Sequence, residues 1–549
     1  MIEERDVMVT MRDGVKTAVD IFRPDAKGKF PALIGLSPYG KGMQSLTVPP
    51  LPAKSPVYER AIEAGDPEFL VGNGYVHIIG DVRGSGGSEG VYRGWMSKQE
   101  AEDGYDLVEW AAAQPWCDGK VGMVGISYYG TIQLTVAALQ PPHLKAIMPW
   151  NAVADYYREA THHGGILQSF YQWLYSQKIG AEKSVSVFRE SLSPEEFKKA
   201  LAKARQDPDL RMYPELFTIV DSPGKLPCYF DAIMYQEDGP YYWERSPYTM
   251  YDKIKIPFHA SSGWWAYAHQ HLSGTFRHYW GINAPKKILI FGKADTLCPL
   301  PREYNEEVIR WYDYWLKGKN TGIMDEPPIK IFVMGRNEWR FEKEWPLART
   351  VWAKYYMRRW EGLSTDPEDA DGKPDCFVQQ PPEEANQIQS VKYLTPVLAK
   401  DLEVTGPIAF YFHASIDQDD TNWFVSLKDV AETGREVELT KGHLKASHRA
   451  LDLDKSKPYL PYHPHVKPEK VTPGKVHEYA IGLAPTCNVF RAGHQIKLEI
   501  SSMDFGRGDI ALTISAHYPY HMCSSKTTLH KIYHDPERPS YLLLPVIPS

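Results

Sequence analysis

The feature that most constrains this chain is a hexapeptide, Gly-Ile-Ser-Tyr-Tyr-Gly, built around Ser127. It comes close to the nucleophile-elbow pattern G-x-S-x-G, in which a serine sits on a sharp turn between a strand and a helix. The strict pattern would place its second glycine at Tyr129, whereas this chain has Gly130. A short β-rich run over 121–125 comes before the serine, and a helical run over 131–139 follows it. The context therefore predicts a strained turn that leaves the serine hydroxyl exposed.

The segments around this turn predict an α/β fold. Residues 6–24 read as a β-hairpin, and 30–36 and 75–80 read as buried strands. An amphipathic helix over 99–114 comes before the strand that leads to the serine. Continuous apolar strands that alternate with helices favour a parallel sheet covered on both faces.

The rhythm changes twice along the chain. Mostly helical segments predict a helical cap inserted over 151–245, after which strands and helices resume and end in a helix at about 304–317. Short strands separated by turn residues then predict an all-β domain, a β-sandwich or jelly roll, over 331–549. The α/β domain is thus expected to comprise 1–150 and 246–330.

Composition excludes several classes of protein. The 549 residues carry a net charge of −7, so no basic surface argues for nucleic acid as a partner. The six cysteines lie far apart and form no C-x-x-C pair, and no other residues have metal-ligand spacing, so we expect neither a metal nor a cofactor. The N-terminus has no apolar signal region, and no apolar run is long enough to cross a membrane. We expect a cytoplasmic protein with a small-molecule substrate, and the sequence leaves open whether it forms a homodimer.

Several motifs together resemble the cocaine-esterase-like branch of the X-prolyl dipeptidyl-peptidase family, over nearly the whole chain. The motifs are Met11-Arg-Asp-Gly-Val15, Pro38-Tyr39, Asp81-Val-Arg-Gly84 through Ser88-Glu-Gly90, the serine turn, Asp313–Gly322, Ser447–Asp452 and Ser501–Phe505. The resemblance implies an α/β-hydrolase domain, an inserted helical cap and a C-terminal jelly roll. It also implies that Ser127 is the nucleophile, and that the Tyr39 hydroxyl and the Tyr128 backbone N–H form the oxyanion hole.

Two positions depart from the family's pattern. The family's catalytic acid follows a Gly-Trp-Tyr motif, and this chain has Ala266 there. The family's histidine position holds Thr296. Two members of the usual Ser-His-Asp triad are therefore missing from their expected places.

A rebuilt triad is one way to restore activity. His269 lies just after the missing acid and Asp295 just before the missing histidine, so His269 could act as base and Asp295 could orient it. His271 and, from the cap, His163 are further sources of an imidazole.

The alternative is that Ser127 has no base. The pocket would then serve non-hydrolytic chemistry, such as a lyase step, C–C cleavage or cyclisation.

The substrate pocket itself is poorly defined by the sequence. We expect Trp264, Trp265 and His163 to contact the substrate, while Gln236-Glu-Asp238 could bind a substrate amine. The function most consistent with the chain is cleavage of an ester, amide or related carbonyl bond in a small organic molecule by Ser127.

Overall fold

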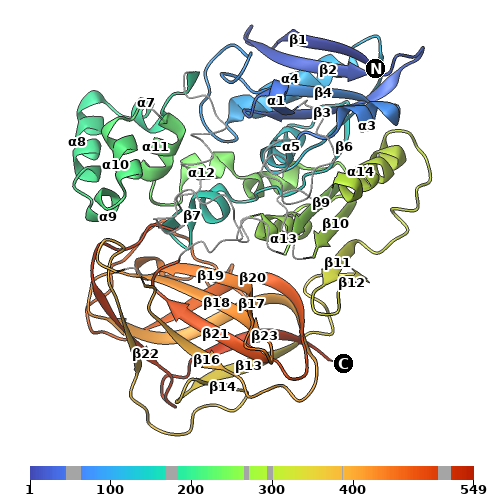
Figure 1. Cartoon of the computed structure of the whole chain (residues 1–549). Helices are drawn as coiled ribbons and strands as arrows, with labels where there is room; N and C mark the ends of the chain where they lie inside the picture. Colours follow the sequence, from blue (N-terminus) through green and yellow to red (C-terminus); the bar gives the residue numbers. More distant parts are fainter. Residues whose placement is uncertain are drawn as a thin grey trace.

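The chain folds into three parts: an α/β domain that contains the N-terminus, a helical cap and a β domain that contains the C-terminus (Figure 1). The computed structural model describes residues 1–44, 63–168, 183–224, 226–264, 271–292, 301–385, 387–504 and 521–548. Within these ranges, no helix is long and apolar enough to cross a membrane.

Ten strands form the first sheet, in the order β1-β2-β4-β3-β5-β6-β9-β10-β11-β12. Their bounds are β1 Ile2–Thr10, β2 Lys16–Arg23, β3 Phe30–Ser37, β4 Val76–Asp81, β5 Cys117–Met123, β6 Leu144–Ile147, β9 Phe258–Gly263, β10 Lys286–Phe291, β11 Ile329–Val333 and β12 Glu338–Glu342. The seven strands from β4 to β11 in this order are parallel, and the pairs β1–β2, β2–β4 and β11–β12 are antiparallel. The N-terminal hairpin and the parallel sheet predicted from the sequence are confirmed. The sheet continues to Glu342, past the domain boundary predicted at residue 330.

Helices cover this sheet. They are α1 Lys41–Gln44, α3 Pro67–Gly72, α4 Lys98–Ala112, α5 Tyr128–Ala138, α13 Leu272–Gly281 and α14 Pro301–Trp315. Buried side chains of α14 belong to one hydrophobic cluster with the sheet, together with Leu70 of α3, and those of α4, α5 and α13 belong to another, together with Val71 of α3. Two separate clusters are what a parallel sheet buried on both faces requires. The long helix predicted near 304–317 is α14, which begins at Pro301.

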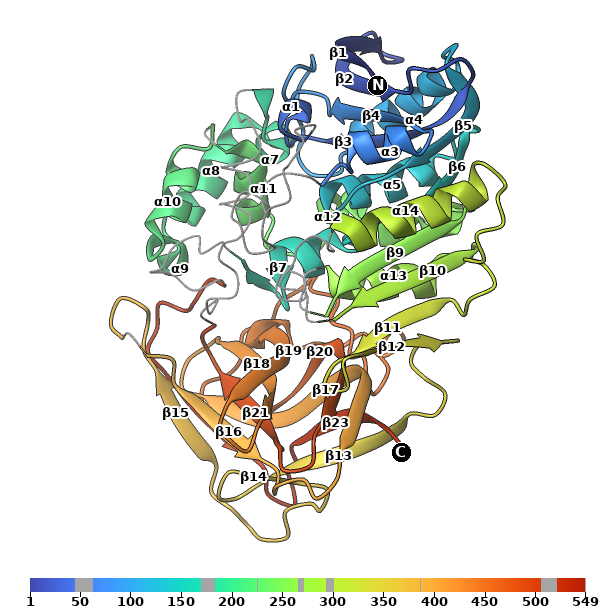
Figure 2. The same ribbon diagram turned by 45° about the vertical axis from the view of Figure 1, so that its right-hand side comes forward.

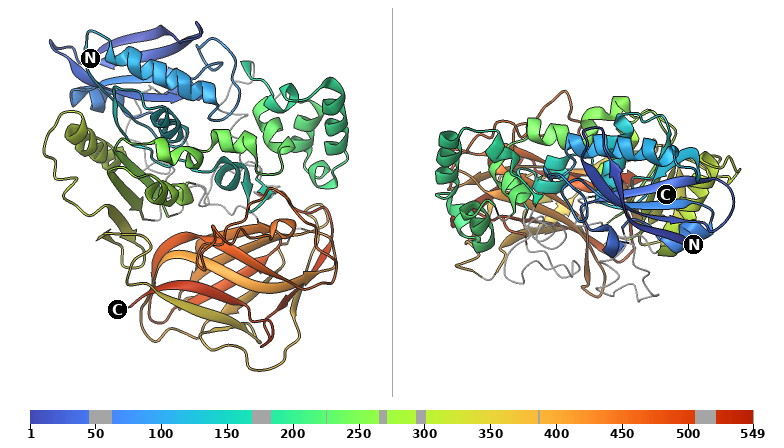
Figure 3. Two further views of the ribbon diagram at one scale, coloured as in Figure 1. Left: turned by 180° about the vertical axis from the view of Figure 1, so that it is seen from behind. Right: turned by 90° about the horizontal axis from the view of Figure 1, so that it is seen from above.

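The cap lies beside the α/β domain and against the β domain, as the views from the side and from behind show (Figures 2 and 3). Its elements are η1 Tyr156–Thr161, β7 His162–His163, β8 Ile166–Leu167, α7 Val187–Glu190, α8 Pro194–Ala204, α9 Pro208–Arg211, α10 Pro214–Asp221, α11 Pro227–Met234, α12 Pro240–Arg245 and η3 Pro247–Lys253. Proline in the first turn of most of these helices removes an N–H that the helix could not satisfy.

One arginine fastens the cap to the β domain. Arg158 forms ion pairs with Asp155 and Asp238 within the cap, at 2.9 and 2.6 Å. Its other guanidinium nitrogen donates to the backbone carbonyls of His463 and Pro464, at 2.8 and 3.0 Å. Because a buried charge is costly unless it is paired and hydrogen-bonded, the cap and the β domain depend on each other here.

Eleven strands form the β domain, in the order β15-β22-β17-β20-β19-β18-β21-β16-β14-β13-β23. Their bounds are β13 Val351–Arg358, β14 Gly362–Ser364, β15 Asp375–Gln379, β16 Ser390–Leu394, β17 Leu402–Ile416, β18 Asn422–Val430, β19 Glu436–Lys445, β20 His477–Phe490, β21 Gln495–Ser501, β22 Thr528–Tyr533 and β23 Tyr541–Ile547, with a 3₁₀ turn, η4, at Ala446–His448. Because β23 also pairs with β17, the sheet closes on itself and is barrel-like. The β-rich domain predicted from the sequence is confirmed, and its jelly-roll connectivity stays a prediction.

Candidate active site

Ser127 occupies the strained turn that the sequence predicts. It lies between β5 and α5 with φ 61° and ψ −113°, a backbone conformation that is uncommon for a residue other than glycine. Two backbone hydrogen bonds of 2.9 Å hold the turn: Ser127 N donates to Trp150 O, and Ile126 N donates to Glu63 O. Such strain persists only where the surroundings fix it, and it gathers at functional sites.

Both glycines of the hexapeptide are required for steric reasons. Gly125 has φ +130°, and a Cβ there would collide with the Tyr129 side chain and lie 2.9 Å from Glu63 O. At Gly130 a Cβ would collide with the Trp150 carbonyl oxygen. Tyr129, in contrast, packs its ring over Gly35, so its own side chain has room. The close approach of α5 to Trp150 therefore explains why the second glycine stands at 130 and not at 129.

His271 is the imidazole that the structure brings to the serine. It is the residue before α13, and its Nε2 lies 3.5 Å from Ser127 Oγ. Burial lowers the pKa of His271 to about 3, so the ring is neutral at physiological pH. A neutral imidazole at this distance can accept the serine proton once substrate draws the two groups together, since catalytic hydrogen bonds are often long without substrate.

The two residues predicted to rebuild the triad lie outside the described residues. This holds for His269 and Asp295, as it does for Trp265 and for the two positions Ala266 and Thr296 that depart from the family's pattern. The pairing of His269 with Asp295 therefore stays a prediction. The contact with Ser127 is made by His271, which the sequence offered only as a further source.

Tyr39 lies beside Ser127. Its side chain is buried, and its hydroxyl is within hydrogen-bonding reach of Ser127. Burial holds the pKa of Tyr39 well above its usual value, so the hydroxyl stays protonated and can donate. The ring is fixed edge-on against Tyr128, with centroids 5.5 Å apart.

Tyr128 can serve the oxyanion only through its backbone. It is the first residue of α5, where the N–H groups of a helix have no partner within the helix. Its side chain instead points to Glu100 of α4, to which the hydroxyl donates a hydrogen bond. Burial raises the pKa of Glu100 to about 7, and the Tyr128 hydroxyl and the Ser97 backbone N–H act against that rise.

Two residues predicted to contact substrate have other surroundings. Trp264 is fully buried, its indole N–H donates to Phe332 O at 2.7 Å, and it stacks on Phe276. Its side chain belongs to the hydrophobic core, and its contact with substrate stays a prediction. His163 faces the β domain, where its Nδ1 lies 2.9 Å from His521 Nε2. Its ring therefore takes part in the contact between cap and β domain.

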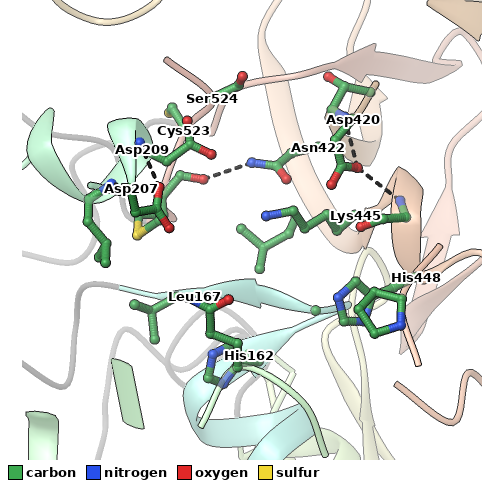
Figure 4. Close-up of a pocket in the computed structure, with 18 of the residues that line it drawn as sticks. His162, Leu167, Asp207, Asp209, Asp420, Asn422, Lys445, His448, Cys523 and Ser524 are labelled. Carbon is green, nitrogen blue, oxygen red and sulfur yellow. Dashed lines mark hydrogen bonds between the residues drawn. The ribbon is translucent and has the colours of Figure 1, made fainter. Parts of the chain in front are cut away.

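The acidic segment of the cap is also engaged. Asp238 pairs with Arg158 at 2.6 Å, which leaves it unsuited to a substrate amine. Gln236 and Glu237 line a cavity of about 190 Å³ between the cap and the β domain. Figure 4 shows this cavity, with His162 and Asp207 on the cap side, and Asp420 and Lys445 on the β-domain side. Ser127 is not among its lining residues, so the cavity is separate from the serine.

A parallel sheet, a serine on a strained turn after a strand and a neutral imidazole at its hydroxyl define a hydrolase of the α/β class. The family model described as X-Pro dipeptidyl-peptidase (S15 family) matches residues 13–295, and that of the X-Pro dipeptidyl-peptidase C-terminal non-catalytic domain matches 321–543. The chain belongs to this family, whose members hydrolyse ester or amide bonds.

Relatives that match most of the chain support the same family. The chain is 27% identical to the cocaine esterase of Rhodococcus sp. (strain MB1 Bresler), covering 99% of this chain and 98% of the relative. It is 26% identical to a putative serine esterase of Mycobacterium tuberculosis, covering 90% of both. A solved CocE/NonD family hydrolase from Staphylococcus aureus superposes with a TM-score of 0.78 at 26% identity, covering 100% of this chain and 94% of that one.

Proposed function

We propose that this protein is a serine esterase of small organic molecules, with Ser127 as nucleophile and His271 as its general base. The observation that carries the proposal is the 3.5 Å approach of His271 Nε2 to Ser127 Oγ at the strained turn. A nucleophile and a base within reach of each other are the minimum for covalent acyl transfer.

In the first half-reaction, Ser127 Oγ attacks the carbonyl carbon while its proton passes to His271 Nε2. The oxyanion that forms accepts hydrogen bonds from the Tyr39 hydroxyl and the Tyr128 backbone N–H. The intermediate then collapses, and His271 returns the proton to the leaving alcohol. In the second half-reaction, water loses a proton to His271, attacks the acyl-enzyme and releases the acid.

The oxyanion hole is expected to supply a large share of the rate. Removing one donor from such a site costs about 10²–10³ in kcat. The buried Tyr39 ring is held by Tyr128 and Tyr129 at centroid distances of 5.5 and 6.3 Å, which supports a pre-organised donor.

The group that orients His271 is expected to be a carboxylate. Our candidate is Asp295, which the sequence predicts to orient His269 and which falls between β10 and α14 in the sequence. An Asp295→Asn variant that loses activity while keeping its fold supports this role, and unchanged turnover removes it.

Esters are preferred to peptides as substrates for two reasons. The relatives at 26–27% identity that match 90% or more of this chain are named esterases. The two that match 90% of it under the name putative Xaa-Pro dipeptidyl-peptidase are 24% identical. A peptide with a free amino terminus also needs an anionic partner, and Asp238 already pairs with Arg158.

The deciding experiment is the intact mass of the purified protein after incubation with a fluorophosphonate, with Ser127→Ala as control. One adduct per chain that is absent from the control supports an activated serine. His271→Ala and His269→Ala then identify the base, because only the loss of the true base abolishes labelling. No adduct on the folded wild-type protein contradicts the proposal and favours non-hydrolytic chemistry in the same pocket. Initial rates on p-nitrophenyl acetate and on Ala-Pro-p-nitroanilide separate esterase from dipeptidyl-peptidase activity.

A further inference from the structure

Three histidines from distant parts of the chain meet where the cap contacts the β domain. They are His163 of β7, His443 of β19 and His521, and one ligand nitrogen of each lies within 4.8 Å of the others. His163 and His521 are buried, at 6% and 0% exposure, and His443 is partly exposed. The ring centroids are 4.5 to 5.5 Å apart.

The hydrogen bonds fix where the protons of two of these rings lie. His163 Nε2 lies 3.1 Å from the Glu159 carbonyl oxygen, which can only accept, so this nitrogen carries the proton. His521 Nδ1 lies 3.1 Å from Asp504 Oδ2, and Asp504 is held ionised by Lys441 at 3.1 Å. His521 Nδ1 therefore also carries a proton.

The remaining nitrogens of these two rings lie close together. They are His163 Nδ1 and His521 Nε2, 2.9 Å apart, and each presents a lone pair when its ring carries only the proton assigned above. Two lone pairs at this distance repel unless a cation lies between or beside them. A metal ion meets that need, as does an extra proton shared by the rings.

The outer contacts match those of a metal site. Histidines that bind metals almost always donate their other N–H to a carboxylate or a backbone carbonyl, which fixes the tautomer. His521 has the carboxylate of Asp504, and His163 has the carbonyl of Glu159. These outer contacts leave His163 Nδ1 and His521 Nε2 as the nitrogens on the side of the cluster.

His443 completes the set and gives a path for entry. Its Nε2 has no hydrogen-bond partner among the described residues. A cavity of about 180 Å³ is lined by both His443 and His163.

We propose that His163, His443 and His521 together bind one divalent transition-metal ion of the Zn²⁺ type, which links the cap to the β domain. Imidazole nitrogen suits Zn²⁺, Ni²⁺ and Cu²⁺, whereas Ca²⁺ and Mg²⁺ require oxygen ligands. Zn–N bonds of about 2.0–2.1 Å place tetrahedral ligand nitrogens about 3.3 Å apart, so the 2.9 Å separation needs a shift of only a few tenths of an ångström. Three protein ligands leave a fourth position for water.

The test uses the full-length protein after removal of metal by a chelator. Calorimetric titration with Zn²⁺ is expected to show one site per chain, and Zn²⁺ is expected to raise the Tm because it binds the folded state. His443→Gln should abolish both effects. His477→Gln, a partly buried histidine of β20 outside the cluster, is the matched control and should bind as the wild type does.

Asp504→Asn tests the outer contact, and we expect a 10–100-fold weaker affinity for Zn²⁺. If His443→Gln does not fold, the test uses the wild-type protein alone. Zn²⁺ should then protect His443 more than His477 from diethyl pyrocarbonate, read by peptide mass spectrometry. No uptake of Zn²⁺ by the wild type, equal uptake by a folded His443→Gln, or no selective protection overturns the proposal and leaves a shared proton between His163 and His521.

Discussion

Buried imidazoles face polar neighbours in two regions of this molecule, and the neighbours differ in what they can offer. At the serine, His271 Nε2 faces a hydroxyl that carries a proton, at 3.5 Å. Between the cap and the β domain, His163 Nδ1 faces another imidazole nitrogen, at 2.9 Å. The first pair can exchange a proton during a reaction, whereas the second is placed to share the metal ion proposed above. The same side chain thus serves as a base or as a ligand according to its neighbour.

The largest effect expected from separating the two regions is that of Ser127→Ala. Loss of the nucleophile should lower kcat/KM for p-nitrophenyl esters on the order of a million-fold. Affinity for Zn²⁺ should stay as in the wild type. Ester kinetics and zinc calorimetry on the same preparation check both, and a change in zinc affinity would show that the two regions are coupled.

The His271→Gln variant tests the imidazole that faces Ser127. Gln keeps a polar group but cannot act as a base, so kcat should fall about a thousand-fold or more while the oxyanion hole keeps some activity. His269→Ala is the matched control from the same loop. If the kcat of His269→Ala falls as far and that of His271→Gln does not, the base is His269, as predicted from the sequence.

Tyr39→Phe removes one proposed oxyanion donor and leaves the ring packing in place. We expect kcat to fall about 10²–10³-fold with little change in KM. Tyr128→Phe is the informative control, because its hydroxyl bonds Glu100 and only its backbone N–H is proposed to donate to the oxyanion. A larger loss in Tyr128→Phe than in Tyr39→Phe would contradict the assignment of the donors.

The smallest expected change is in the pH profile. With a His271 pKa of about 3, the ring stays neutral down to pH 5, so kcat/KM should be level between pH 8 and 5. A histidine with the usual pKa near 6.5 would lose about 30-fold over that range. Because the folded pKa lies below the unfolded one, the stability due to neutral His271 is present above about pH 6.5 and is lost as pH falls toward 3. Urea midpoints at each pH separate lost activity from unfolding.

The elbow could be predicted from the sequence because its signals are local. A β-rich run, two glycines around a serine and a helical run lie next to each other in the chain, and each glycine proves to be a steric requirement. The parallel sheet follows from apolar strands in the same way. The role of the two tryptophans after β9 is ambiguous in the sequence, because a tryptophan can line a pocket or fill a core. Trp264 is fully buried.

The histidine cluster could not be predicted from the sequence. His163, His443 and His521 have no ligand spacing, and they meet only because β7 of the cap packs against the β domain. The sequence therefore predicts no metal. Asp504 and His521, which contact each other, are only 17 positions apart, but this spacing is not a ligand motif. His271, the base proposed here, was predicted only as a further source of an imidazole, because its approach to Ser127 depends on the folded chain.

The carbonyl contacts of Arg158 also set an order of events during protein synthesis. His463 is separated from Arg158 by 305 positions, which at ribosomal rates of 5–20 residues per second amounts to about 15–60 s of translation. Until then, Arg158 can reach its acidic neighbours in the nascent cap but not the carbonyls that complete its surroundings. The cap therefore matures only when most of the polypeptide has left the ribosome.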